Sequence, residues 1–336
     1  MSATLAILRV GPSVTVQDLG RPGTMANGLS RGGAADRTAL VEGAALLGQG
    51  PDCAALELAG FGGEFTASAD IRIALTGAPM QVRLDDQPLA WNASHRIEAG
   101  QRLSIGAALR GIYGYLHVGG GIDTPVFLGS RATHLVSGIG SALKAGAKLP
   151  VGPDRPGALT GLTLRVDERF AGGTVRILPS VQTDRFAEET LRRFTATPFS
   201  RTARGNRQGV ELAFDGDPFA CADQLSILSE PMVAGDIQMT GEGVPFVLLP
   251  ECQTTGGYPR VATVLPDDLP LVAQAGPGTV LHFAFIDHET AVAAHRPPAV
   301  LLDDLRRRVE PLVRDPHMMH DLLSYQLISG VVNALD

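Results

Sequence analysis

Short runs in which apolar and polar residues alternate recur along most of the chain. They are rich in β-branched and aromatic residues and are separated by glycine or proline, a pattern typical of short strands joined by tight turns. The 40 glycines and 23 prolines are spread evenly, so that no single linker collects them. We therefore expect a mainly β fold, with strands at residues 4–10, 13–17, 54–59, 71–77, 112–118, 174–178, 209–214, 245–249 and 279–285.

Helical periodicity is confined to a few segments. Residues 35–48 predict a helix that ends at Gly48, and residues 184–194 predict a second helix with Asp184 as its N-cap. The pattern over residues 291–336 predicts a helical C-terminal tail. Helices are thus expected to be few and short within a β protein.

The length of 336 residues favours two domains, since one core rarely grows that large. Residues 98–105, 144–152 and 274–283 each predict an Ala-Gly turn that leads into a closing strand. This echo fits an internal duplication, and it fits equally well the turns common to any β protein. We expect a first domain over residues 1–155 and a second over residues 156–290, each closed into a barrel because closure removes exposed strand edges.

Composition and charge argue against several classes of protein. The net charge of −7 gives no basic surface for nucleic acid. No stretch approaches the ~20 apolar residues of a membrane helix, and the N-terminus lacks the basic region of a signal peptide. Three scattered cysteines suit reduced thiols and form no metal-binding spacing. We expect a cytoplasmic protein with no metal site, no nucleic-acid partner and no membrane partner.

Lysine is almost absent, because Lys144 and Lys148 are the only lysines among 28 basic residues. The chain has no Met-Lys-Met motif to carry biotin and no Walker phosphate loop. Any anion bound by this chain must therefore be held by arginine or by backbone N–H groups.

The run QTTGGYPR, residues 253–260, collects groups that recognise a small polar ligand. Its two glycines permit backbone torsions with which N–H groups converge on an anion, and its side chains add an amide, hydroxyls and a guanidinium. Residue types alone fit a polar hairpin equally well. The candidates in this run are Gln253, Thr254, Thr255, Gly256, Gly257, Tyr258 and Arg260.

A second cluster lies in residues 16–37, just before the first predicted helix. Charged side chains alternate there with glycines, and the Gly32–Gly33 step leads into a helix N-terminus, which favours negative charge. An ion-paired loop that caps a barrel explains the same residues. The charged residues are Asp18, Arg21, Arg31, Asp36 and Arg37.

Five motifs, taken in order, resemble the family of allophanate hydrolase subunit 2. They are TVQDLGRPG, GGAADRTAL, YLHVGGGID followed by FLGSRAT, SEPMVAGDIQ, and QTTGGYPRVATV, and together they extend over nearly the whole chain to about residue 290. The family includes the C subunit of bacterial 5-oxoprolinase, the KipA-type antagonist of a kinase inhibitor, and half of the urea carboxylase carboxyltransferase domain. The resemblance implies two cyclophilin-like β-barrel domains. The chain departs from the family pattern at GNRQG, residues 205–209.

The resemblance implies the C subunit of an ATP-dependent 5-oxoprolinase, which opens 5-oxoproline to glutamate. Its partners would be the B subunit of 5-oxoprolinase, or an allophanate hydrolase subunit 1-type protein, and a LamB/YcsF-type A subunit. Its cofactor would be ATP, with or without Mg²⁺. One alternative is a carboxyltransferase or allophanate hydrolase subunit acting on urea or a related amide, with biotin on a separate carrier chain. Another is a KipA-like antagonist that catalyses nothing.

The resemblance also implies a small planar amide as the substrate, and the chain offers groups for each part of it. We expect Arg260 and Arg21 to clamp an anion, Gln253 and Thr255 to orient the amide, and Asp18 or Asp36 to act as base or metal ligand. The remaining substrate-binding candidates are Gln238, Thr254, Gly256, Gly257, Tyr258 and Arg31.

Overall fold

The first half of the chain forms two β-sheets that pack face to face. The computed structural model describes residues 3–155, 157–221 and 228–313. One sheet has the order β11 (Lys148–Pro150), β1 (Thr4–Val10), β4 (Phe61–Ala67), β9 (Arg102–Ala108), β6 (Met80–Leu84) and β7 (Gln87–Pro88). The other has the order β2 (Thr15–Gln17), β3 (Ala55–Ala59), β10 (Tyr113–Val118), β5 (Ile71–Gly77), β8 (Ala93–Ile97), β12 (Leu162–Leu164) and β22 (Val309–Pro311). Both sheets bury their apolar positions in one common core.

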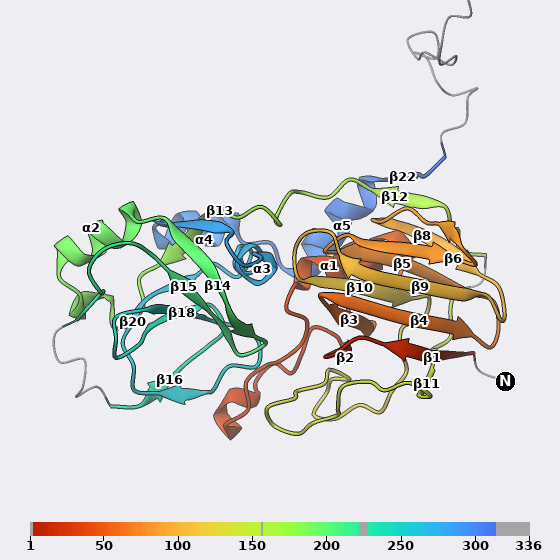
Figure 1. Ribbon diagram of the computed structural model, residues 1–336, viewed down its shortest axis with the longest axis horizontal. Coiled ribbons are helices and arrows are strands. Elements are labelled where there is room, and N and C mark those ends of the chain that lie inside the picture. The colour runs from red at the N-terminus through yellow and green to blue at the C-terminus, as the bar shows by residue number, and fades with distance from the viewer. Residues whose placement is uncertain (1–2, 156, 222–227, 314–336) are drawn as a thin grey trace, which may run out of the picture.

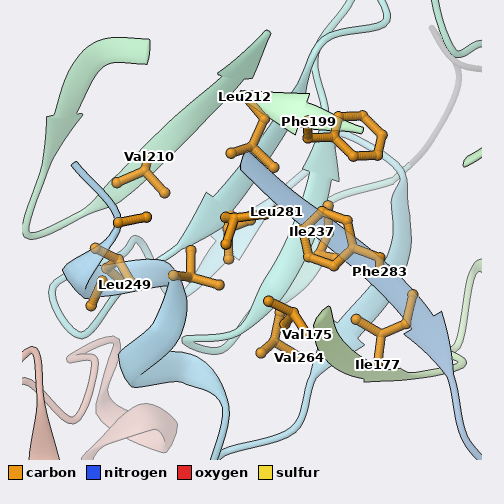
Figure 2. Close-up of a cluster of buried hydrophobic side chains, with 14 of the residues drawn as sticks. Val175, Ile177, Phe199, Val210, Leu212, Ile237, Leu249, Val264, Leu281 and Phe283 are labelled. Carbon is orange, nitrogen blue, oxygen red and sulfur yellow. The ribbon is translucent and has the colours of Figure 1, made fainter. Parts of the chain in front are cut away.

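The second half forms a closed barrel beside these sheets (Figure 1). Its order is β13 (Gly173–Leu178), β20 (Arg260–Val264), β17 (Asp236–Met239), β18 (Pro245–Leu248), β15 (Gly209–Ala213), β14 (Phe199–Asn206) and β21 (Val280–Phe285). The barrel closes where β13 and β21 pair in parallel, and its other pairs are antiparallel. Alternate residues point inward, so Val175, Phe199, Leu212 and Phe283 meet in its core (Figure 2). A separate two-stranded sheet joins β16 (Glu230–Pro231) and β19 (Thr255–Gly256).

Helix α1 (Arg37–Leu47) lies between the two halves. Its start is fixed by Asp36, whose Oδ1 accepts a hydrogen bond from Ala39 N at 3.0 Å, and its end by Gly48 in the left-handed conformation. One face of α1 packs with α5 (Pro298–Arg307), and residues Ala39 and Leu40 join the hydrophobic core of the barrel. The other helical elements are η1 (Thr24–Asn27), η2 (Thr183–Arg185), α2 (Glu188–Ala196), α3 (Leu269–Gln274) and α4 (His288–Ala294).

The mainly β fold predicted from the sequence is confirmed, and each predicted strand is present. The helix at residues 35–48 is also confirmed. Of the two expected barrels, the second is closed, whereas the first half is built as two packed sheets. No helix of the described residues is long and apolar enough to cross a membrane.

Two helical predictions were wrong in detail. The helix predicted at residues 184–194 begins only at Glu188, because residues 183–185 form a separate 3₁₀ turn and Asp184 does not cap it. In the predicted helical tail, Val309–Pro311 is the edge strand β22, where a proline is tolerated because it needs no partner for an N–H group. Residues 314–336 of that tail lie outside the described residues.

The sheet of the first half receives strands from outside residues 1–155. Strand β12 comes from the segment predicted to begin the second domain, and β22 comes from the predicted tail. Helix α5 also packs on α1, so the chain returns to the first half after completing the barrel. The strands of this sheet therefore come from both sides of the domain boundaries predicted at residues 155 and 290.

A buried histidine on β10 packs directly against α1. The Nε2 atom of His117 lies 2.8 Å from Thr76 Oγ1, and that hydroxyl donates its own proton to Ala39 O at 2.8 Å. The Thr76 oxygen must therefore accept from His117, which fixes the neutral tautomer with its proton on Nε2. A Cβ at Gly43 would lie 2.3 Å from the His117 ring.

We expect Gly43→Ala to destabilise the protein by about 1–3 kcal/mol, because the added methyl overlaps the His117 ring. At an unobstructed helical site the same change usually stabilises by up to ~1 kcal/mol. The change in unfolding free energy is measured by urea unfolding of Gly43→Ala, His117→Ala and the double variant. In the His117→Ala background the Gly43→Ala change should be neutral or stabilising, and stabilisation in the wild-type background would contradict the packing.

The stability should also depend on pH through His117. Burial lowers the pKa of His117 from 6.5 to about 3. The unfolded chain then binds a proton that the folded chain does not, so stability is lost as pH falls below about 6.5. Between about pH 7 and pH 5 we expect this residue to cost about 2 kcal/mol of unfolding free energy. Urea unfolding of His117→Gln should show a pH dependence smaller by that amount, and an equal dependence would exclude this assignment.

Candidate functional site

The loop between β2 and α1 is folded back on itself by two glycines. Gly20 and Gly33 have φ values of +79° and +82°, and a Cβ on Gly20 would lie 2.6 Å from Arg31 O. This close crossing allows Arg21 N to donate to Arg31 O at 2.8 Å. The two arginines are thereby placed side by side near the start of α1.

Asp18 holds the base of this loop. Its Oδ1 accepts from Gly20 N at 2.8 Å and from Ser130 Oγ at 2.5 Å, and its Oδ2 accepts from Arg131 N at 2.7 Å. These bonds occupy both oxygens and tie the loop to residues 130–131. The predicted role of Asp18 as base or metal ligand stays a prediction, and this geometry gives it a structural task.

A cavity of about 320 Å³ lies where this loop meets the second half of the chain. We call it the arginine cavity, because Arg21, Arg31 and Arg37 line it and no acidic residue of the described chain does. Its opposite wall comes from Met232–Ala234, Pro250, Pro266, Leu269 and Pro270. Gly32 N donates to Pro250 O at 3.0 Å and joins the two walls.

The arginines of this cavity have no carboxylate partners among the described residues. Arg21 is buried and donates to three backbone carbonyls, those of Phe127, Ser130 and Ala132, while its Nη1 has no partner within the described chain. Burial lowers the pKa of Arg21, and Asp18 partly offsets this. Buried cations are usually paired, so an unpaired one indicates a place for an anion.

Arg37 is the second unpaired cation at this cavity. It is half-buried, and neither an ion pair nor a side-chain hydrogen bond joins it to any described residue. Burial and the nearby charge of Arg31 lower the pKa of Arg37 to about 10. Arg31 stands at the exposed rim, where only its Nε is bonded, to Leu19 O at 2.9 Å. Guanidinium groups in this arrangement suit a carboxylate or a phosphate, which accept two parallel hydrogen bonds.

Asp36 lies behind the arginine cavity and is fully buried. Besides capping α1, it accepts from Arg169 Nε at 2.7 Å and from Gln274 Nε2 at 2.8 Å through Oδ2. Arg169 in turn makes a two-pronged ion pair with Glu42. Asp36 thus links α1 to both halves. Acting as a base would require it to leave these partners, so that role stays a prediction.

Arg260, the predicted anion clamp of the QTTGGYPR run, is buried and already paired. Its Nη2 donates to Glu230 Oε2 at 2.6 Å, and its Nη1 donates to Pro231 O at 2.7 Å and lies 3.4 Å from Asp236 Oδ2. The Gln182 side chain accepts from Arg260 N at 2.9 Å. Sequence could not reveal this, because its acidic partners lie 24 and 30 residues earlier in the chain. Binding a ligand anion through Arg260 would require displacing these partners.

The rest of that run contains one short strand, paired with β16, and borders a separate cavity. Thr255 and Gly256 make strand β19, and Thr254 O accepts from Met232 N at 2.9 Å. Gln253 and Tyr258 line a cavity of about 210 Å³ together with Gln238, while Gly257 directly follows β19. A cluster of Met232, Leu248, Cys252 and Phe246 lies between this cavity and the arginine cavity.

The predicted site residues therefore fall into two groups. Arg21 and Arg31 meet in the arginine cavity, whereas Gln238, Gln253 and Tyr258 meet in the smaller cavity. Arg37 was recognised in the sequence as part of the charged cluster but was given no role. Arg207, in the segment GNRQG, was given no role in the sequence analysis, and it forms buried ion pairs with Glu57 and Glu251. Among the described residues no group of three or more His, Cys, Asp or Glu side chains is placed to hold a metal ion.

Comparison with known proteins agrees with this organisation. Residues 27–285 match the family model described as carboxyltransferase domain, subdomain A and B. The C subunit of 5-oxoprolinase from Escherichia coli (strain K12) is 34% identical over 298 residues, which cover 87% of this chain and 94% of the relative. The corresponding C subunit from Haemophilus influenzae (strain Rd) is 32% identical, covering 90% of this chain and 98% of the relative.

A solved structure also shares the fold. The crystal structure of the Kluyveromyces lactis urea carboxylase superposes with a TM-score of 0.80 at 23% identity. The match covers 94% of this chain and 31% of that one, so this chain corresponds to about a third of the larger enzyme. Its arrangement of two packed sheets and a barrel therefore occurs inside a longer protein as well. Together with the match over residues 27–285, these similarities show that the chain belongs to the family of the carboxyltransferase domain, subdomain A and B, which includes the C subunit of 5-oxoprolinase.

Proposed function

We propose that this chain is the C subunit of an ATP-dependent 5-oxoprolinase and that it opens 5-oxoproline to glutamate together with a B-type and an A-type subunit. The observation that carries the proposal is identity of 32–34% with two 5-oxoprolinase C subunits over nearly their whole length. The B-type partner would be related to allophanate hydrolase subunit 1, and the A-type partner to the LamB/YcsF proteins.

The arginine cavity suits the chemistry of this substrate. 5-Oxoproline carries a carboxylate beside a planar lactam, and its opening places negative charge on the lactam oxygen. Arg37 and Arg31 are free to bind the carboxylate in a two-pronged manner, and the unpaired Nη1 of Arg21 adds positive charge from behind. A preorganised cluster of cations stabilises charge as it develops, without reorganising at the moment of reaction.

The same donors fit the phosphate groups of ATP. In this alternative Arg31 and Arg37 would hold a phosphate in place of the substrate carboxylate, and ATP would supply the phosphoryl group that makes the unreactive lactam a better electrophile. Mg²⁺ commonly arrives with the nucleotide, held by one or two carboxylates and by the phosphates themselves. The residues of this chain would then position an anion, and the nucleotide base would be held elsewhere in the complex.

Reconstitution with its partner subunits tests the proposed function. Purified together with B-type and A-type subunits, the chain should support ATP hydrolysis that is stimulated by 5-oxoproline and yields glutamate. Urea and allophanate, assayed in parallel, should not stimulate it. Stimulation by urea or allophanate in place of 5-oxoproline would favour the carboxyltransferase or allophanate hydrolase alternative, and stimulation by none would favour a KipA-like antagonist.

The role of Arg37 can be tested in the same complex. Arg37→Gln should lower kcat/KM for 5-oxoproline by about 10-fold to 100-fold, because a hydrogen bond to a charged group contributes roughly 1.5–3 kcal/mol. The matched control is Arg192→Gln on α2, since Arg192 is exposed and its ion pairs within the described chain are with Glu188 and Glu189 of its own helix. Equal activity of both variants in an assembled complex would remove Arg37 from the site and leave the proposed reaction standing.

A further inference from the structure

A second cavity lies between the two halves and shares no lining residue with the arginine cavity. It encloses about 340 Å³. One wall is the β14–β15 hairpin with residues 205–208, and the facing wall is formed by Gly60 and by the start of β10. Leu135 and Val136 stand at its mouth, where they are 37% and 54% exposed.

Arg201 on β14 is a buried cation in this cavity without a carboxylate partner in the described chain. Its backbone is held on both sides, because its N donates to Thr279 O and its O accepts from Gly278 N. Arg201 is only 6% exposed, yet among the described residues its side chain makes one hydrogen bond, from Nη1 to Thr202 O at 3.1 Å. Its Nε is buried with no partner in the described part of the chain. Burial lowers the pKa of Arg201.

The backbone is shaped around this guanidinium. The register of β14 against β15 shifts between Arg201 and Gly205, as in a β-bulge. A Cβ at Gly205 would lie 2.7 Å from Arg201 Nη2, so only glycine leaves room for the side chain where it stands. Bulges often re-aim a side chain beside a functional site. Arg201 is therefore fixed in position while most of its donors stay unused.

The neighbouring acids form no ion pair with Arg201 within the described chain. Glu251 and Glu57 both pair with Arg207, which lines the same cavity, and within the described residues no ion pair joins either acid to Arg201. Glu57 and Glu251 carry two negative charges against the one positive charge of Arg207, so Arg201 balances the total charge of the group without contacting either acid. The unused donors of Arg201 suit one carboxylate of a ligand, whereas a second carboxylate would face the two glutamates.

Tyr113 supplies a second donor beside Arg201. It is 4% exposed, and its hydroxyl has no hydrogen-bond partner among the described residues. Burial and Glu57 raise the pKa of Tyr113 to about 12, so the hydroxyl keeps its proton, while the charges of Arg207 and Arg201 act on it in the opposite direction. The remaining walls are largely apolar and include Ala59 and Ile112.

We propose that this second cavity binds a small monocarboxylate with an apolar body, whose carboxylate is held by Arg201 and by the Tyr113 hydroxyl. The apolar part of the ligand contacts Ile112, Leu135 and Val136. This site is independent of the proposed reaction, because it shares no residue with the arginine cavity.

Isothermal titration of the full chain with phenylacetate tests the site. Phenylacetate should bind the wild-type chain more tightly than its neutral analogue phenylacetamide. Arg201→Gln should weaken phenylacetate binding by about 10-fold or more, and Tyr113→Phe by about 3-fold to 10-fold, since each removes one donor to the carboxylate. Binding of phenylacetamide should not change in Arg201→Gln.

Two control variants separate this site from the other cavity. Arg37→Gln and Arg192→Gln should bind phenylacetate as the wild type does. Undetectable binding to the wild-type chain at millimolar concentration, or equal affinity in Arg201→Gln, would overturn the proposal. Loss of binding in Arg37→Gln alone would place phenylacetate in the arginine cavity and would also overturn it. If Arg201→Gln does not fold by circular dichroism, unchanged affinity in Tyr113→Phe, which keeps the ring and the backbone bonds, decides against the site.

Discussion

The arrangement of the two halves depends on one buried arginine. Arg207 of the β14–β15 hairpin donates Nε to Glu251 Oε1 at 2.5 Å, Nη2 to Gly33 O at 2.5 Å, and Nη1 to Glu57 on β3. Although burial alone would lower it, Glu57 and Glu251 raise the pKa of Arg207. A buried charge that loses its partner costs roughly 3–5 kcal/mol, so the halves are held in the one orientation that satisfies it.

This constraint shapes both cavities, because each takes walls from both halves. The same device recurs at Arg169, which joins Asp36 and Glu42, while Gln274 ties Asp36 to the backbone of Tyr113. Against these fully satisfied networks, Arg21, Arg37 and Arg201 stand out as cations without acids in the described chain. The contrast within one molecule separates arginines that build the interface from arginines left available to a ligand.

Local patterns in the sequence were sufficient for the mainly β fold and for α1, since capping by Asp36 and Gly48 depends only on neighbouring residues. They were insufficient wherever the deciding partner is distant. The pairing of Arg260 with Glu230 and Asp236, the strand character of Val309–Pro311, and the separation of Gln253 from Arg21 all arise from contacts between remote segments. The residue types in QTTGGYPR indicated a polar hairpin as readily as a pocket, and its short strand β19 instead pairs with the distant strand β16.

Strand β22 pairs with the edge of β12, so the sheet of the first half is completed only after the chain has passed through the barrel. The barrel is inserted between two strands of another sheet, and it closes only when its last strand, β21, pairs with its first, β13. During synthesis the sheet that contains β12 is completed only when residues 309–311 emerge, long after its other strands have left the ribosome. Its β12 edge stays open in the meantime, and open edges are where chains associate wrongly. Cutting the gene between the halves would therefore expose an edge in one product and leave an unpaired strand in the other.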